Sequence, residues 1–484
     1  LVSVALLGCA KTNQPSSPEE AKNAQTVTIG YTQFPTNIDP ADEYNGWFTV
    51  RYGVGETLFK MDDQLVPQPW LAEKIEQTSQ LEWKITLRND VTFQNGEKMT
   101  GAKVEASLKR LIEKSKRAAA DLGVESIQSD GQTVTIKTKS EQPIMKNLLA
   151  EPYSVIVDVD GKAASDKAPV GTGPFLIKTY TPETGASLEA YENYWGGKAK
   201  VAQVQIKYFS DPTAISAALQ SKEVDAVYGL PYANLANFKK NSQYKISEKE
   251  GGRYLSYVYN FEDPYVADDQ FRQALDTLVD KKTYTESLFK GAAVPATGPL
   301  PSSSDFALDK SVHEFNVEKA KKLLDDAGYK DKDGDGLRED KNGNKLSFNF
   351  AIRNTGAEYD QALADVFVKS WKEVGLDVKL VDGKLMSPKD FSQRVQADDP
   401  SIDIFQAAWQ FGTNPNRQEL LGKKAPLNLY RYTTEAFENS FKAQGSAEMF
   451  DDAKLKAAYN KFDGEVAEEL PFFPLSWDTS ISFF

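Results

Sequence analysis

The residue types that most often carry chemistry in proteins are scarce in this chain. Its 484 residues include one cysteine, Cys9, and one histidine, His313. A single cysteine excludes an internal disulfide and any cysteine-based zinc or iron–sulfur site. His313 lies in a polar stretch, and no Gly-x-Ser-x-Gly motif supplies a nucleophile for it. We therefore expect an ordinary surface or hydrogen-bonded histidine, and neither a catalytic residue nor a metal site.

Two short motifs resemble ligand sites, and both are incomplete. The stretch 331–336 (DKDGDG) matches the start of an EF-hand loop, but position twelve is Asn342 where a bidentate Glu is required. The stretch 171–174 (GTGP) lacks the third glycine and the following helix of a dinucleotide fingerprint. We interpret the first as a tight acidic turn, favoured over a calcium site, and the second as a turn. No cofactor is expected.

The number and distribution of charged residues indicate which kinds of molecule the protein can bind. The chain carries 70 Asp and Glu against 57 Lys and Arg, with a net charge of −13, and its basic residues are scattered. Nucleic acid is therefore not an expected partner, since phosphate binding requires a basic stripe. Paired carboxylates leave no local signature, so a secreted carboxylate-dependent hydrolase stays open as an alternative.

The first residues resemble a targeting signal. Residues 1–8 are an apolar run too short to cross a bilayer, and Leu6-Leu7-Gly8-Cys9 resembles the bacterial lipobox. Residues 10–25 are polar and contain Pro15 and Pro18, as in a flexible tether. We interpret 1–25 as a signal-peptide remnant, lipobox and tether with Cys9 lipidated, in preference to a buried segment.

The remaining chain is long enough for more than one hydrophobic core. Alternating apolar residues predict strands at 26–30 and 81–87, and Thr100 is a predicted helix N-cap. The segment 204–227 has the pattern of a βαβ crossover. The segment 363–380 is predicted to be a second α/β unit, with a helix, a glycine that ends it and a strand. Two separate α/β layers indicate two lobes.

Seven further patterns, in a fixed order, resemble the large peptide- and nickel-type solute-binding proteins of ABC importers, family 5. They lie at 83–100, 171–175, 191–197, 225, 259–275, 315–329 and 409–415. The resemblance covers essentially the whole globular length and is closest to the oligopeptide-binding members. It implies an α/β fold of the two-lobed periplasmic-binding-protein type (type II, large peptide-binding subclass), with an extra subdomain in the first lobe.

On this resemblance the chain divides as follows. Lobe I comprises 26–62, 165–252 and 453–484; the inserted subdomain is 63–164, and lobe II is 253–452. The lobes are expected to close around ligand like a hinge, about crossings near Arg253 and Asp452.

The resemblance also implies which residues face the ligand. From lobe I these are Gln33, Phe34 and Pro35, with Tyr254 beside the first crossing. From lobe II they are Ala408, Trp409, Gln410, Phe411, Gly412, Thr413 and Asn414. This second segment is expected to offer its backbone to a peptide. Trp409 also fits a buried-strand pattern, so a core position is the alternative. Many peptide-binding relatives have an Asp at position 412, which pairs with the ligand's amine; the glycine here removes that anchor.

The resemblance implies the extracellular substrate-binding subunit of an ABC importer. On this reading the protein is a monomer and not an enzyme, because it captures its ligand without changing it chemically. Its partners would be an oligopeptide ligand and the permease, with the membrane reached by the lipid anchor alone at the outer face of a bacterial cytoplasmic membrane. A receptor for a nickel chelate, haem or another small ligand on the same fold is the alternative, although few His, Cys and Met are present for direct metal ligation.

Overall fold

The computed structural model describes residues 26–483 except 43, 161–167, 309–312, 357–358, 424, 426 and 430. The interpretation of residues 1–25 and of Cys9 lies outside these residues. In the part that is described, no helix combines the length and apolar character needed to span a membrane.

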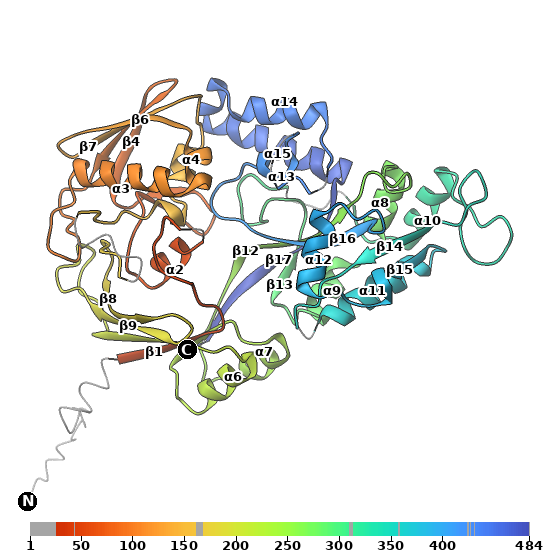
Figure 1. The fold of residues 1–484 in the computed structure, drawn as a ribbon, viewed down its shortest axis with the longest axis horizontal. Helices are drawn as coiled ribbons and strands as arrows, with labels where there is room; N and C mark the ends of the chain where they lie inside the picture. Colours follow the sequence, from red (N-terminus) through yellow and green to blue (C-terminus); the bar gives the residue numbers. More distant parts are fainter. Residues whose placement is uncertain are drawn as a thin grey trace, which may run out of the picture.

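One mixed sheet runs through both lobes (Figure 1). Its strand order is β15-β14-β16-β12-β17-β11-β1-β10-β9-β8, and β13 pairs with β17 beside this path. The central strands β12 (Ile246–Tyr259) and β17 (Phe472–Phe483) are long and antiparallel, and the chain passes between the lobes in both. Their register shifts between Glu250 and Tyr254. Arg253 lies in this irregular stretch, whereas Asp452 begins a helix that precedes β17.

Lobe I contains the predicted βαβ unit. Strands β10 and β11 both pair with β1 in parallel, and helix α6 joins them, with Asp211 as its N-cap. The predictions for 26–30 and 204–227 are thus confirmed. The elements of lobe I are β1 (Thr26–Tyr31), β8 (Phe175–Thr181), β9 (Gly185–Ala190), β10 (Gln203–Tyr208), α6 (Pro212–Gln220), β11 (Ala226–Tyr228) and α7 (Tyr232–Lys239).

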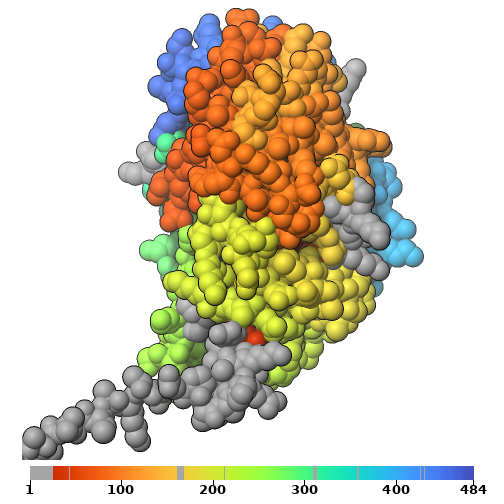
Figure 2. Space-filling model, turned by 90° about the vertical axis from the view of Figure 1, so that its left-hand side faces the viewer, coloured from red at the N-terminus to blue at the C-terminus, as the bar shows by residue number. Residues whose placement is uncertain are grey.

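The strands β4-β5-β7-β6 form a sheet of their own, apart from the large one. Its residues, orange in Figure 2, lie above the yellow residues of lobe I. Its core includes Trp83, Ile85 and Leu87 from the predicted strand and Val104 from helix α3, which Thr100 caps as predicted. This body and the segment leading to it contain α2 (Gly46–Arg51), β2 (Phe59–Met61), β3 (Pro67–Pro69), β4 (Ala72–Ser79), β5 (Glu82–Leu87), α3 (Gly101–Lys114), α4 (Lys116–Leu122), β6 (Val124–Asp130), β7 (Thr133–Thr138), α5 (Met145–Leu148) and η1 (Pro152–Ser154).

The stretch 171–174 is a turn, as predicted, and its glycines allow close packing. A Cβ on Gly171 would lie 2.1 Å from the backbone oxygen of Val54, and one on Gly173 2.3 Å from that of Gly53. The turn therefore joins the start of β8 to the segment that leads into the subdomain.

Lobe II has the second α/β layer. Helix α11 buries Leu363, Phe367 and Trp371, and β15 then pairs in parallel with β14, which confirms the prediction for 363–380. The elements of this lobe are α8 (Asp269–Thr277), α9 (Lys281–Ser287), β13 (Ala293–Pro295), α10 (Val317–Asp326), β14 (Ser347–Ala351), α11 (Asp360–Lys372), β15 (Asp377–Leu380), η3 (Val381–Gly383), α12 (Pro388–Gln396), β16 (Ile404–Gln410), α13 (Gln418–Leu421), α14 (Glu435–Gln444) and η4 (Ala447–Phe450).

Helix α15 (Asp452–Glu469) connects two hydrophobic cores. Leu455 and Tyr459 pack into the core of the subdomain, whereas Phe462 and Val466 pack into a core of lobe II. The helix therefore ties the subdomain to lobe II before the chain returns through β17.

Candidate functional site

A cleft of about 940 Å³ lies where the two lobes meet along β12 and β17. Its lining comes from α2, the start of α7, the irregular stretch of β12, the loop before α11 and the end of β16. Ligand pockets measure roughly 300–1,000 Å³, so this cleft suits a large ligand. In Figure 1, α2 and β16 stand on opposite sides of β12 and β17, so the cleft has one wall in each lobe.

The wall from lobe I is aromatic. Tyr44, Trp47, Phe48 and Arg51 follow the spacing i, i+3, i+4, i+7 and all line the cleft. The other side of α2 packs tightly, because a Cβ on Gly46 would lie 2.2 Å from the backbone oxygen of Pro152. The helix therefore presents one face to the cleft and fixes its opposite face on the subdomain.

A stacked pair of tyrosine rings joins the two walls of the cleft. Tyr232, the first residue of α7, stacks on Tyr359, which precedes α11, with ring centroids 5.5 Å apart and planes 22° from parallel. Both rings line the cleft. One ring belongs to each lobe, so this contact spans the cleft between them.

The floor of the cleft contains an ion pair next to two glycines, which have no side chains. Gly251 and Gly252 line the cleft on β12, and Nη1 of Arg253 lies 3.8 Å from Oδ2 of Asp478 on β17. Burial raises the pKa of Asp478 to about 6, and the charge of Arg253 opposes that rise. Arg253 therefore already has an ionic partner within the protein.

The lobe I residues inferred from the resemblance take different places. Gln33 is exposed and lines the cleft. The ring of Phe34 packs on Tyr208, and Pro35 is buried with its backbone oxygen accepting a hydrogen bond of 2.6 Å from the Tyr180 hydroxyl. Gln33 alone of these three faces the ligand space.

Tyr254 and Trp409 lie outside the cleft lining. Tyr254 is fully buried, with its ring 4.7 Å from that of Trp477 in a lobe II core, and Trp409 is half-buried against the same core. On β16, Ala408 borders a narrow recess that shares Arg253 with the cleft. Gln410 and Phe411 line the cleft itself.

The segment 412–414 contacts the subdomain instead of the ligand space. The Thr413 hydroxyl donates to the backbone oxygen of Asn147 at 2.6 Å, and the Asn414 amide donates to Oε1 of Glu151 at 2.7 Å. A Cβ at Gly412 would lie 2.2 Å from Oε2 of Glu151. The carboxylate of Glu151 thus occupies the space that a side chain at position 412 would need.

Glu151 is fully buried and has one charged neighbour. Nη2 of Arg117 lies 3.7 Å from Oε2 of Glu151. Burial raises the pKa of Glu151, although Arg117 and the Asn414 amide act against that rise. Contacts between lobe II and the subdomain therefore include a buried carboxyl group with no access to the cleft.

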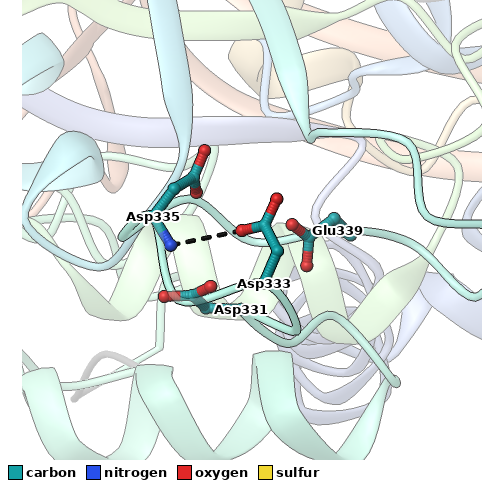
Figure 3. Close-up of side chains that lie close together, drawn as sticks. All are labelled: Asp331, Asp333, Asp335 and Glu339. Atoms are coloured by element: carbon teal, nitrogen blue, oxygen red, sulfur yellow. Dashed lines mark hydrogen bonds between the residues drawn. The ribbon is translucent and has the colours of Figure 1, made fainter.

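His313 and the acidic turn are both remote from the cleft lining. His313 is 9% exposed and has a backbone hydrogen bond at Ala467, which agrees with the hydrogen-bonded alternative rather than the surface one; burial lowers its pKa. In Figure 3 the carboxylates of Asp331, Asp333, Asp335 and Glu339 converge. Nζ of Lys345 lies 2.9 Å from Asp333 and 2.8 Å from Asp335, and it also contacts Glu339. Lys345 therefore contacts three of these four carboxylates and offsets part of their negative charge.

The aromatic face of α2 was not singled out from the sequence. The spacing of these residues can be seen in the sequence, but a short aromatic run predicts a buried core segment, since large apolar side chains are usually buried. Asp478 was missed for another reason, because it follows a fully buried strand segment and has no motif around it.

Comparisons with known proteins agree with this architecture. Residues 66–424 match the model of the bacterial extracellular solute-binding proteins, family 5. The nickel-binding protein NikA of Staphylococcus aureus is 32% identical over 280 residues, which are 58% of this chain and 57% of that protein. The oligopeptide-binding protein AppA of Bacillus subtilis is 24% identical over 440 residues, covering 86% of this chain and 79% of AppA.

Solved structures show the same fold. The nickel ABC transporter structure from Bacillus halodurans superposes with a TM-score of 0.81 at 25% identity, covering 95% of both chains. AppA of Bacillus subtilis in complex with a nonapeptide gives a TM-score of 0.70 at 22% identity, covering 95% of this chain and 94% of that one. The two-lobed fold is therefore confirmed, and the chain belongs to family 5 of the bacterial extracellular solute-binding proteins.

Proposed function

We propose that this protein captures oligopeptides in the cleft and delivers them to the permease of an ABC importer, without chemical change to the ligand. The observation that carries the proposal is an edge of strand β16 beside the cleft that no described strand covers. Strand β14 pairs with β16 only at Ile404 and Phe405. Beyond these, Gln406 and Ala407 are buried, whereas Ala408 borders a recess beside the cleft and Gln410 lines the cleft itself.

The hydrogen-bonding groups on that edge point away from β12. The Phe411 amide donates to the backbone oxygen of Gly252 at 2.8 Å, which makes these two residues a bonded antiparallel pair. Bonded and non-bonded pairs alternate, so the backbone N–H and C=O of Gln410 and Ala408 are directed to the open side. An extended peptide can add there as a further strand, and its side chains would occupy the rest of the cleft.

The size and the donors of the cleft favour this ligand over a metal ion held directly. No His, Cys or Met occurs among the cleft-lining residues, and these are the side chains that nickel prefers along with backbone nitrogen. AppA, the relative with the longer match, is named for oligopeptide binding. The resemblance to NikA keeps a nickel chelate as the second candidate, because a chelate brings its own metal ligands.

Tetraalanine isolates the backbone contribution, since it has no functional side chains. Methylating the nitrogen of its third residue should weaken binding about 5- to 150-fold, because one buried carbonyl then loses its donor at a cost of roughly 1–3 kcal/mol. N-terminal acetylation should have little effect, since Gly412 provides no carboxylate for the amine. Isothermal titration of the three peptides measures both effects. Equal affinity of the methylated peptide would reject strand addition as the mode of capture.

We also propose that Cys9 carries the lipid that holds the protein at the outer face of the membrane. In a cell expressing the full precursor, a Cys9→Ser variant should appear in the medium while the wild type stays with the membrane. Acylation requires that thiol, and two or more chains are needed for stable retention. Immunoblots of membrane and medium fractions measure the distribution. Retention of the serine variant in the membrane would remove the anchor from the proposal.

A further inference from the structure

Arg51 stands out among the charged groups at the cleft. It is the last residue of α2, it is exposed, and it lines the lobe I wall. Its guanidinium carbon lies 4.6 Å from the ring centroid of Tyr228 and 5.6 Å from that of Phe48. Stacking on aromatic faces orients a guanidinium and leaves the N–H groups at its edge available for in-plane acceptors.

The other arginines near the cleft are already engaged. Arg253 has Asp478 at 3.8 Å, and Arg117 has Glu151 at 3.7 Å. Within the described residues, no carboxylate lies within 4.0 Å of the Arg51 guanidinium. Arg51 is thus a cation with its planar face supported by aromatic rings and its donors unused by the part of the chain that the structure describes.

The acidic residues of the cleft are held by donors of the protein. Oδ1 of Asp211 accepts the Thr213 amide at 2.8 Å, as the cap of α6. Glu250 accepts hydrogen bonds from the backbone amides of Ser302 and Ser303 at 3.0 and 2.8 Å. These carboxylates cannot turn to Arg51 without leaving those donors unpaired, so the guanidinium is left for an anion from outside.

We propose that Arg51 is the anchor for a carboxylate of the ligand, and that the cleft selects ligands with a free carboxylate. The arginine fork matches a carboxylate in bidentate geometry and binds it more strongly than a neutral acceptor. The proposal rests on the proposed function for its favoured source, the C-terminus of a peptide. A carboxylate of an amino-acid metal chelate offers the same chemistry.

The position of Arg51 gives the anchor a second role. Arg51 ends α2, which lies on the lobe I side of β12 and β17, whereas β16 lies on the lobe II side (Figure 1). A ligand that binds β16 through its backbone and Arg51 through its carboxylate bridges the lobes. Such a ligand favours the closed state over the open one, which is the requirement for ligand-driven closure.

Two pairs of probes distinguish the sources of the carboxylate. The first pair is a random tetrapeptide library with free C-termini and the same library as C-terminal amides. The second pair is nickel with L-histidine and nickel with L-histidinamide, which lacks the carboxylate. Each probe is incubated with the folded protein, separated by size exclusion and quantified by mass spectrometry.

Three variants test the residue itself. Arg51→Gln removes the charge, Arg51→Lys keeps the charge without the fork, and Arg88→Gln is the matched control. Arg88 also stacks on an aromatic ring, that of Trp195 at 4.3 Å, but it lies outside the cleft lining and pairs with Asp90. Thermal unfolding of each variant verifies that it is folded.

The wild type should retain the free-acid library at least tenfold better than the amide library, because a charge-assisted bidentate pair is lost on amidation. That preference should vanish in Arg51→Gln, fall to an intermediate value in Arg51→Lys and persist in Arg88→Gln. Equal retention of acid and amide by the wild type would overturn the anchor and leave peptide capture intact.

The nickel probes separate failure of the anchor from failure of peptide capture. If the wild type retains no peptide but retains nickel–histidine in an Arg51-dependent way, the anchor stands and the peptide proposal falls. Retention of nickel–histidinamide as strongly as nickel–histidine would overturn the anchor for the chelate. A folded wild type that retains none of the four probes overturns both proposals.

Discussion

A Gly412→Asp variant is expected to unfold at a clearly lower urea concentration than the wild type. The new Cβ would lie 2.2 and 2.3 Å from the two carboxylate oxygens of Glu151, a fully buried residue whose Oε1 accepts the Asn414 amide. Overpacking alone costs about 1–3 kcal/mol, and a second carboxylate beside a buried one adds to that cost. We therefore expect a loss of about 3 kcal/mol or more, measured by urea denaturation.

Gly445→Asp provides the matched control. Gly445 follows α14, its φ is −89°, and a Cβ there would meet no atom closer than 3.7 Å. This change should cost well under half as much as Gly412→Asp. Combining Gly412→Asp with Glu151→Ala should recover part of the loss, since the space is then vacant. If Gly412→Asp and Gly445→Asp unfold at the same midpoint, Glu151 is not pressed against the loop in solution.

The second large effect is a dependence of stability on pH that originates at Asp463. This residue of α15 is fully buried, and burial raises the pKa of its carboxyl to about 7, although the Leu308 amide donates to it at 2.9 Å. The folded pKa lies above the unfolded value of 3.8. The stabilising contribution is therefore present at low pH and is lost as the pH rises through about 7.

Asp463→Asn removes that titration while keeping a hydrogen-bond acceptor for Leu308. Between pH 5 and pH 8 the wild type should lose about 2–3 kcal/mol relative to this variant. Other carboxyl groups titrate in both proteins and cancel in the difference. Urea midpoints at each pH unit give the measurement, with Asp452→Asn, exposed on the same helix, as the control. Parallel curves for wild type and Asp463→Asn would contradict a raised pKa at this residue.

Those parts of the fold with one exposed and one buried face could be predicted from the sequence. The βαβ unit at 204–227 and the helix 363–372 alternate apolar and polar residues with the right periods. Strand β17 gave no such signal, because residues 472–477 are buried on both faces and Asp478 to Ser480 are polar. The crossing near Asp452 came from the family resemblance and stays a prediction; Asp452 itself begins helix α15.

Helix α15 shows why the sequence does not place a lobe boundary near Asp452 unambiguously. Leu455 and Tyr459 pack on the subdomain, while Phe462 and Val466 pack on lobe II. A helix held between two cores has apolar residues on more than one side, so its periodicity is weak. Boundaries of this kind depend on tertiary packing and cannot be read from one segment alone.

The candidate site was accessible to the sequence only in part. The resemblance pointed to 408–414, and Gln410 and Phe411 do line the cleft, but whether Gly412 faces ligand or protein depends on Glu151, far away in the sequence. Tyr254 and Tyr257 lie on opposite faces of β12, and both side chains are buried. Orientation at the cleft is set by the pairing of β12 with β16 and β17, which the local pattern does not reveal.

The place of β17 in the sheet constrains the order in which the chain can fold during synthesis. This strand lies between β12 and β11, and Phe483 pairs with both Ile246 and Val227. Until residues 472–483 have left the ribosome, β11 and β12 each keep an unpaired edge in the middle of the sheet, which invites pairing with other chains. Contacts between such distant segments also form slowly. The chain therefore keeps these two strand edges exposed, and prone to aggregation, until residues 472–483 have paired with them.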